Sequence, residues 1–448
     1  MKPSTTTIGV CSYCMKPVPA VKQVVGTEVY LEKRCPIHGT ERTRIAKDSH
    51  RFFDDTFAVE GKPVHVRQTV RKNGCPSDCG LCPDHRQHLC TGLIEITDRC
   101  NLSCPICYAD AKRETDQTGD LAVSEFENRL ETLLQAEGGK LDVLQISGGE
   151  PTIHPRFEEI LDLAASKNIG RILINTNGLR LLEDDGPIRL LEKHRDKAET
   201  YLQFDGFDDE VYRSLRNASL CAQKRRIVER LDRRHMKISL TATIAKENLK
   251  EIPAILDYAC RVESITGVTF QRLTRVGRAK NHTVFPQKSE MILQEDILYA
   301  IGQSGFLKYD DLIPLPCSHV NCTSLGFLFR TETGKVYSLA DFIDYARCKE
   351  VISDRIAFDR SILDAMKKNV CCCFVPKIPG EPQLLDKLRE FSDGDGSSHH
   401  GMKILRILVK NFMDADTFDA ERARQCCVGV SVGENRIIPF CVHNLLTQ

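Results

Sequence analysis

Short apolar runs alternate with amphipathic stretches through the middle of the chain. Six runs have the length and β-branched content of buried strands, at residues 91–97, 141–146, 171–176, 200–204, 236–243 and 266–271. The stretches between and after them repeat apolar residues at helical spacing, at residues 121–136, 155–167, 188–194, 220–234 and 249–260. Ser124 followed by Glu127 predicts a capping box for the first helix. This alternation predicts an α/β fold with a parallel sheet and helices outside it.

Outside this core the pattern is less regular. It predicts a β-rich segment at 21–30, an apolar run at 402–413, a helix at 414–424, and a turn and strand at 433–441. Residues 404–409 could line an apolar channel, but a buried strand is the favoured interpretation. Residues 392–401, rich in Gly, Ser, Asp and His, predict a surface loop.

Charge and composition narrow the class of protein. Lys plus Arg and Asp plus Glu both number 62, so no net field recruits nucleic acid. No apolar run approaches the ~20 residues of a spanning helix, and no signal-peptide core opens the chain. We therefore expect a cytoplasmic protein, with peripheral membrane contact still possible. Its 21 cysteines are then more consistent with metal ligands than with disulfides.

Three cysteines directly after the first strand carry the most specific chemical signal. Cys100, Cys104 and Cys107 are spaced C-x₃-C-x₂-C, which lets three thiolates hold three irons of a [4Fe–4S] cube and leaves one iron open. A zinc site or a chance cluster is the alternative. After the second strand, Gly148-Gly149-Glu150-Pro151 offers backbone that a ligand can approach closely.

This combination, with Tyr108 after the third cysteine, resembles the radical S-adenosylmethionine (SAM) enzymes. The resemblance implies a partial (β/α)₆ TIM barrel whose catalytic cysteines bind a [4Fe–4S] cluster and SAM. It places Tyr108, Gly148, Gly149 and Glu150 at SAM, with Glu150 holding the ammonium group. The carboxylate, ribose and adenine would meet polar groups at later strand ends, namely Asn175, Asn177, Asp205 and Arg272. An ordinary loop role is the alternative for each.

Two further cysteine groups precede the core. Cys11, Cys14, Cys35 and His38 form two knuckles that can close a tetrahedral site for zinc or iron. His38 could instead be only a turn residue. Four cysteines within sixteen residues, Cys75, Cys79, Cys82 and Cys90, suit a complete auxiliary [4Fe–4S] site, with a zinc knuckle as the alternative.

The cysteine pattern over nearly the whole chain is similar to one subgroup, the archaeal tetraether lipid synthases and their relatives, some of which were assigned as pterin methyltransferases. By analogy, Cys317, Cys322, Cys427 and Cys441 would close a second auxiliary cluster, with Cys426 or Cys348 as substitutes. The chain then divides into a rubredoxin-like or zinc-ribbon-like module at 1–50, a cluster segment at 51–90, a core at 91–280 and a C-terminal auxiliary-cluster extension at 281–448.

The resemblance implies a 5′-deoxyadenosyl radical that abstracts hydrogen from an unactivated C–H bond, with ferredoxin or flavodoxin as a low-potential electron donor. Joining of lipid alkyl chains is the favoured reaction. Methylation of a pterin-type heterocycle and modification of a peptide are the alternatives, as is a non-catalytic metal protein. A lipid substrate requires a long apolar channel, whereas a pterin requires a compact pocket with amide-matching groups.

Overall fold

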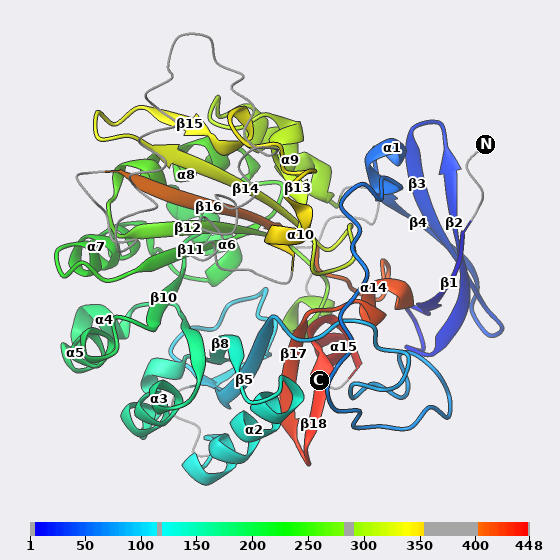
Figure 1. Ribbon diagram of the computed structural model, residues 1–448, viewed down its shortest axis with the longest axis horizontal. Helices are drawn as coiled ribbons and strands as arrows, with labels where there is room; N and C mark the ends of the chain where they lie inside the picture. Colours follow the sequence, from blue (N-terminus) through cyan, green and yellow to red (C-terminus); the bar gives the residue numbers. More distant parts are fainter. Residues whose placement is uncertain (1–4, 114–118, 282–290, 354–401, 447–448) are drawn as a thin grey trace.

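A twisted sheet of parallel strands forms the centre of the molecule (Figure 1). The computed structural model describes residues 5–113, 119–281, 291–353 and 402–446, so the surface loop predicted at 392–401 lies outside them. Six parallel strands lie side by side in chain order: β5 (Thr91–Thr97), β8 (Leu141–Gly148), β9 (Ile169–Thr176), β10 (Ala198–Gln203), β11 (Ile238–Ile244) and β12 (Ile265–Arg272). All six predicted strands are confirmed, and they form the partial (β/α)₆ barrel.

The predicted helices also form, and their apolar sides pack on this sheet. They are α2 (Val123–Ala136), α3 (Phe157–Ser166), α5 (Gly186–Lys193), α7 (Cys221–Asp232) and α8 (Ile252–Arg261). Two short helices, α4 (Arg180–Glu183) and α6 (Asp209–Arg216), were not predicted. The predicted capping box is wrong. Helix α2 already begins at Val123, and its N-cap residue, Ala122, has no side-chain hydrogen bond. The spacing of Ser124 and Glu127 alone did not locate the first turn of α2.

Strands from the C-terminal extension lengthen both edges of the barrel sheet (Figure 1). On one edge β16 (Lys403–Lys410) pairs in parallel with β12, and β14 (Thr323–Arg330) pairs antiparallel with β16. On the other edge β17 (Val428–Gly433) pairs in parallel with β5 and antiparallel with β18 (Arg436–Pro439). The buried strand predicted within 402–413 is therefore confirmed. Smaller elements are β6 (Arg99–Cys100), β7 (Lys112–Arg113), α9 (Gln294–Gly302), β13 (Ile313–Pro314), β15 (Val336–Ser338), α10 (Lys349–Ile352) and α15 (Phe440–Leu446).

The helix predicted at 414–424 is shorter than expected. Only α14 (Ala420–Arg424) is helical. The Asp414 side chain instead accepts hydrogen bonds from the Thr417 backbone N–H at 3.0 Å and its hydroxyl at 2.8 Å, which makes a turn, and Asp419 then caps α14. Local side-chain acceptors of this kind compete with helix formation.

An antiparallel four-stranded sheet forms the N-terminal module: β1 (Thr5–Val10), β2 (Pro17–Val25), β3 (Glu28–Cys35) and β4 (Gly39–Ala46), followed by α1 (Ser49–Phe52). It docks on residues 415–419 through buried polar groups. The Lys22 ammonium lies 2.6 Å from the Asp419 carboxylate, and Lys33 donates to the Ala415 carbonyl at 2.8 Å. The Thr7 hydroxyl donates to Asp419 at 2.6 Å. The module is thus tied to the segment that leads into α14.

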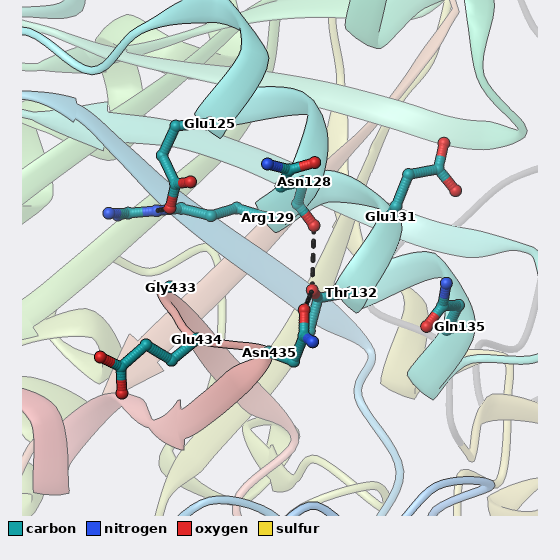
Figure 2. Close-up of a pocket in the computed structure, with 9 residues that line it drawn as sticks. All are labelled: Glu125, Asn128, Arg129, Glu131, Thr132, Gln135, Gly433, Glu434 and Asn435. Carbon is teal, nitrogen blue, oxygen red and sulfur yellow. Dashed lines mark hydrogen bonds and ion pairs between the residues drawn. The ribbon is translucent and has the colours of Figure 1, made fainter.

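The hairpin of β17 and β18 packs against α2 and leaves a hollow of about 390 Å³ between them. Figure 2 shows that this hollow is lined by α2 side chains and by the turn at residues 433–435. The Thr132 hydroxyl donates to the Asn128 carbonyl at 2.9 Å and to the Asn435 side chain at 3.2 Å. None of the predicted functional residues lines this hollow, so we interpret it as a packing feature.

Candidate active site

A cavity of about 270 Å³ opens at the carboxyl ends of the parallel strands. Cys100, Cys104 and Cys107 lie on one wall, and a second set of cysteines lies elsewhere on its lining: Cys322, Cys426, Cys427 and Cys441. The remaining lining combines amide and hydroxyl groups from the strands with the aromatic rings of Tyr108, Phe412 and Phe440. Among the described residues the cavity brings together the three motif cysteines and five of the eight residues predicted to bind SAM.

The three motif cysteines are held by the backbone around them. Cys100 accepts a hydrogen bond from the Leu102 N–H at 3.4 Å, and Cys107 from the Ala111 N–H at 3.4 Å. The Arg278 guanidinium fixes this loop by donating to the Cys104 carbonyl at 3.0 Å. Burial raises the pKa of the Cys100 thiol to about 12, with the Glu150 charge adding to it. Such thiols lose their protons when a metal binds, so the donor set fits a thiolate-ligated cluster.

The Gly148-Gly149 segment packs directly on the strand that leads into the cysteine loop. The Gly149 N–H donates to the Thr97 carbonyl at 2.7 Å, and the Glu150 N–H donates to the Arg99 carbonyl at 2.8 Å. Both glycines line the cavity. A Cβ at Gly149 would lie 2.0 Å from the Arg99 carbonyl oxygen, which is backbone and cannot give way. Both glycines therefore bring cavity backbone close to the cysteine loop, as expected of a SAM-binding wall.

Gly149→Ala is expected to weaken SAM binding by about tenfold or more, because the loop must move away from the cysteines, and to cost about 1–3 kcal/mol in unfolding free energy. Equilibrium dialysis with SAM and urea denaturation measure the two effects. Gly302→Ala is the matched control, since the nearest atom to its Cβ would be the Tyr309 nitrogen at 3.6 Å. Equal SAM affinity in both variants would contradict the assignment.

Glu150 differs from its expected role at the SAM ammonium group. Its carboxylate is buried and accepts hydrogen bonds from the Thr152 and Thr176 hydroxyls, both at 2.6 Å, and from the Asn177 N–H at 2.7 Å. It does not line the cavity. Glu150 therefore joins the end of β8 to the end of β9, and positions cavity groups instead of facing a ligand.

Asn175 and Asn177 do line the cavity, as expected. The Asn175 amide donates to the Ser147 hydroxyl at 2.9 Å and accepts from the Gln145 amide at 2.6 Å. The Asn177 amide donates to the Asn101 side chain at 2.7 Å and lies 3.9 Å from the Cys100 sulfur. Asn177 is thus placed beside the cysteine loop, where a ligand of the cluster would lie.

Asp205, like Glu150, does not face the cavity, although it was expected to bind SAM. It is fully buried, does not line the cavity, and pairs with Arg216 at 2.7 and 2.9 Å. Burial alone would lower the Arg216 pKa, but the Asp205 and Cys104 charges raise it above its usual value. Arg216 lines the cavity, so the cation that the sequence analysis missed faces the motif cysteines. Asp205 orients it.

Arg272 holds the extension and is not exposed to the cavity. It is buried and donates to the Asn411 side chain at 3.1 Å and to the Phe412 carbonyl at 2.8 Å. Its own carbonyl lies 3.5 Å from the Tyr108 hydroxyl. Tyr108 packs edge-on against Phe412, with ring centroids 5.8 Å apart, and lines the cavity as expected. Arg272 therefore supports an aromatic wall.

The structure groups the auxiliary cysteines differently from the prediction. Cys90 lies with Cys317 and Cys427, and these three buried sulfurs are all within 4.8 Å of one another. The reason is strand pairing: β5 begins at Thr91 and pairs with Val428, which places Cys90 beside Cys427. Cys90 is therefore separated from the expected set with residues 75, 79 and 82.

The other cysteines of the two predicted sets occupy different surroundings. Cys79 interacts electrostatically with Cys75, Cys82 and Cys426. Cys322 and Cys441 remain on the cavity wall, where the Arg422 side chain donates to the Cys322 sulfur at 3.4 Å. Within the predicted set of residues 317, 322, 427 and 441, Cys427 therefore belongs both to the buried group with Cys317 and to the cavity lining with Cys322 and Cys441.

The four predicted ligands of the N-terminal module do come together. The ligand atoms of Cys11, Cys14, Cys35 and His38 all lie within 4.8 Å of one another, with the His38 Nδ1 3.5 Å from both the Cys11 and Cys35 sulfurs. Four ligands with no open position suit a structural metal. His38 faces the site and is more than a turn residue.

Cys14→Ala is expected to remove the metal of this module while leaving iron in the rest of the protein, as measured by elemental analysis for zinc and iron. Cys260→Ala is the matched control, because Cys260 is buried in the barrel core and belongs to no group of ligand atoms among the described residues. An unchanged metal content in Cys14→Ala would contradict this assignment.

Comparison with known proteins matches the same regions. Residues 94–259 match the radical SAM superfamily, and residues 4–47 match the HMPTM N-terminal zinc ribbon domain. Residues 94–259 therefore form a radical SAM domain. It is 28% identical, over 98% of this chain and 93% of that protein, to 7,8-dihydro-6-hydroxymethylpterin dimethyltransferase of Methanocaldococcus jannaschii.

More distant similarities cover part of the chain. The antilisterial bacteriocin subtilosin biosynthesis protein AlbA of Bacillus subtilis is 26% identical over 50% of this chain and 47% of its own length. The crystal structure of Streptococcus suis SuiB bound to precursor peptide SuiA superposes with a TM-score of 0.41 and 16% identity, over 49% of this chain and 46% of that one. Among the described residues, no helix is long and apolar enough to cross a bilayer.

Proposed function

We propose that this radical SAM enzyme methylates a pterin-type heterocycle. The observation that carries the proposal is the compact cavity facing Cys100, Cys104 and Cys107, whose strand-borne lining carries four amides: Gln145, Asn175, Gln203 and Gln271. A pterin ring presents amide-like donors and acceptors along its edge, and such a lining is complementary to it. The relative that spans nearly the whole chain is named for a reaction on a dihydropterin.

The lipid reaction favoured by the sequence is less well supported by the cavity. The apolar residues 404–409 were the candidate channel lining, and they are instead part of β16. In β16, only Lys410 lines the cavity. Apolar side chains contribute the larger share of the lining, but Arg216, Lys410 and the amides would cost free energy against an alkyl chain, because these polar groups would lose water without gaining partners. Joining of alkyl chains remains the second reaction to test.

The roles of this chain's residues follow from their placement. We assign Cys100, Cys104 and Cys107 as ligands of a [4Fe–4S] cluster, with Arg216, Asn177 and the Gly148-Gly149 backbone around SAM. When bound, the cluster, SAM and an electron supply a 5′-deoxyadenosyl radical. Tyr108 and Phe412 exclude water from this side of the cavity, which protects a reactive intermediate.

We assign auxiliary metal sites to the revised cysteine groups. One consists of Cys90, Cys317 and Cys427, whose sulfurs lie within 4.8 Å of one another. The other is assigned to Cys75, Cys79 and Cys82 from their spacing in the sequence, with Cys426, whose charge helps to raise the Cys79 pKa, as the fourth ligand. Both sit beside the C-terminal strands, and Cys426 and Cys427 reach the cavity. Their placement suits auxiliary [4Fe–4S] clusters that exchange electrons with a bound substrate.

The proposal is tested by following deuterium from the substrate into 5′-deoxyadenosine. Protein reconstituted anaerobically with iron and sulfide is given SAM, a low-potential reductant and dihydro-6-hydroxymethylpterin deuterated at its saturated carbons. Deuterium in the 5′-deoxyadenosine is expected, whatever the source of the methyl group, and methyl-labelled SAM then identifies that source. Parallel samples contain a dialkyl phospholipid. Unlabelled deoxyadenosine with pterin, together with a coupled lipid that has lost hydrogen, would overturn the proposal in favour of the lipid reaction.

A further inference from the structure

A continuous row of polar side chains crosses four neighbouring strands at the cavity. Strand register places Thr243 of β11 opposite Gln271 of β12, Gln271 opposite Lys410 of β16, and Lys410 opposite Thr323 of β14. Residues directly opposite on adjacent strands project from the same face of a sheet. All four line the cavity. The row is therefore one surface, built half from the barrel and half from the C-terminal extension.

Lys410 is the cation in this row, and its ammonium group is available to a ligand. Its ammonium lies 5.9 Å from the centres of the Tyr201 and Phe412 rings. Within the described part of the chain no carboxylate or carbonyl pairs with it, whereas Lys403 at the other end of β16 donates to the Ala259 and Ile265 carbonyls. A half-buried ammonium without an anion is costly, so this geometry suits a ligand that supplies an acceptor.

The residues beside Lys410 present further polar groups to the same ligand. The Gln271 amide donates to the Tyr201 hydroxyl at 3.1 Å, which orients that phenol along the row. Both residues line the cavity beside Lys410. An ammonium, an amide and a phenol on one face can bind an oxygen acceptor and its adjacent polar atoms.

We infer that Lys410, with Gln271 and Tyr201, binds an oxygen acceptor of the substrate and sets its orientation in the cavity. This inference rests on the proposed function. In a pterin-type substrate the acceptor is either the ring carbonyl or a phosphate ester on the side chain, since both present oxygen to a cation. Strand β16 lies outside residues 94–259, so the extension contributes the cation to substrate recognition and the barrel contributes Gln271 and Tyr201.

Binding without turnover tests this. Reconstituted protein with SAM and no reductant is titrated with dihydro-6-hydroxymethylpterin and with its phosphate ester, following pterin fluorescence. Lys410→Met is expected to bind about 10- to 100-fold more weakly, the loss expected for a charge-assisted hydrogen bond, whereas Lys410→Arg retains most of the affinity. A loss for both ligands identifies the ring carbonyl, and a loss confined to the ester identifies the phosphate. Lys308→Met, at an exposed surface lysine, is the matched control.

Other outcomes separate the possible failures. Equal binding by the unsubstituted protein and Lys410→Met would overturn this inference alone. Failure of the unsubstituted protein to bind either ligand would overturn the proposed function, and this inference with it. The charge of Lys410 also lowers the pKa of Cys427, so an altered iron–sulfur absorption spectrum with unchanged pterin binding would assign Lys410 to the metal group and overturn a substrate role.

Discussion

Cys104→Ala is expected to reduce 5′-deoxyadenosine formation from SAM to the background of protein-free samples. Only three thiolates are available on this loop, and a cluster that needs one open iron uses all of them. Arg216 faces Cys104, so substitution of Cys104 also leaves the buried Arg216 cation without its neighbouring thiolate. The measurement is anaerobic SAM cleavage with a chemical reductant, followed by chromatography.

The matched control for this result is Cys221→Ala. Cys221 is buried, donates to the Phe207 carbonyl at 3.0 Å, and lies outside every metal-ligand group of the described residues. It should retain SAM cleavage and full iron content. If Cys104→Ala cleaves SAM as fast as Cys221→Ala, the assignment of the catalytic cysteines is wrong.

Asp419→Ala is expected to lower the free energy of unfolding by about 3–5 kcal/mol, because it leaves the Lys22 ammonium buried without its partner. Asp419 also accepts from the Thr7 hydroxyl at 2.6 Å and caps α14 at the Glu421 N–H. Helix α14 carries Arg422, which contacts Cys322, so the variant should also retain less iron. Urea denaturation and iron analysis measure these effects.

Asp257→Ala is the control for this buried pair. Asp257 makes an exposed ion pair with Arg261, which contributes at most about 1 kcal/mol. Comparable destabilisation by both substitutions would show that docking of the N-terminal module does not depend on the Lys22–Asp419 pair. Although burial raises the Asp419 pKa, the Lys22 charge holds it below its usual range. The pair's contribution is therefore present above the ordinary carboxyl pKa, about 3.9, and is lost as pH falls below it.

The fold followed from the sequence because its signal is local. Each strand of the barrel is a short apolar run, and each helix has its own apolar stripe, so periodicity was sufficient. Helix ends were less certain, as Ser124 shows: its spacing to Glu127 is favourable, but the chain is already helical one residue earlier. Packing of the α2 side chains decides where that helix begins, and packing is not visible in a four-residue pattern.

The prediction of the site succeeded where its residues are close in the sequence and failed where they are far apart. The three motif cysteines and the paired glycines were found as linear motifs, and both line the cavity. The contact of Cys90 with Cys427 depends on parallel pairing of two strands more than 300 residues apart, which spacing does not encode. Glu150, Asp205 and Arg272 fall at the expected strand ends, but their hydrogen-bond partners turn them inward.

Two cations that the structure brings to the cavity were missed for different reasons. Arg216 is the last residue of α6, and nothing in its spacing relates it to Cys104. Lys410 did carry a signal, since it is the first charged residue at the carboxyl end of a long apolar run. Had that run been placed in the parallel sheet, the rule that functional groups follow such strands would have selected it.

The two sheet extensions also determine when the protein can become complete during synthesis. At the two edges β5 pairs with β17 and β12 pairs with β16, and the ribosome makes both of these partners long after the strands that they cover. Until then both edges of the nascent barrel present unpaired backbone groups, which is the state in which newly made chains associate with one another. Cys427 also emerges late, so its metal group cannot close on a partial chain. A cluster held by Cys90, Cys317 and Cys427 would therefore be assembled only after translation is nearly finished.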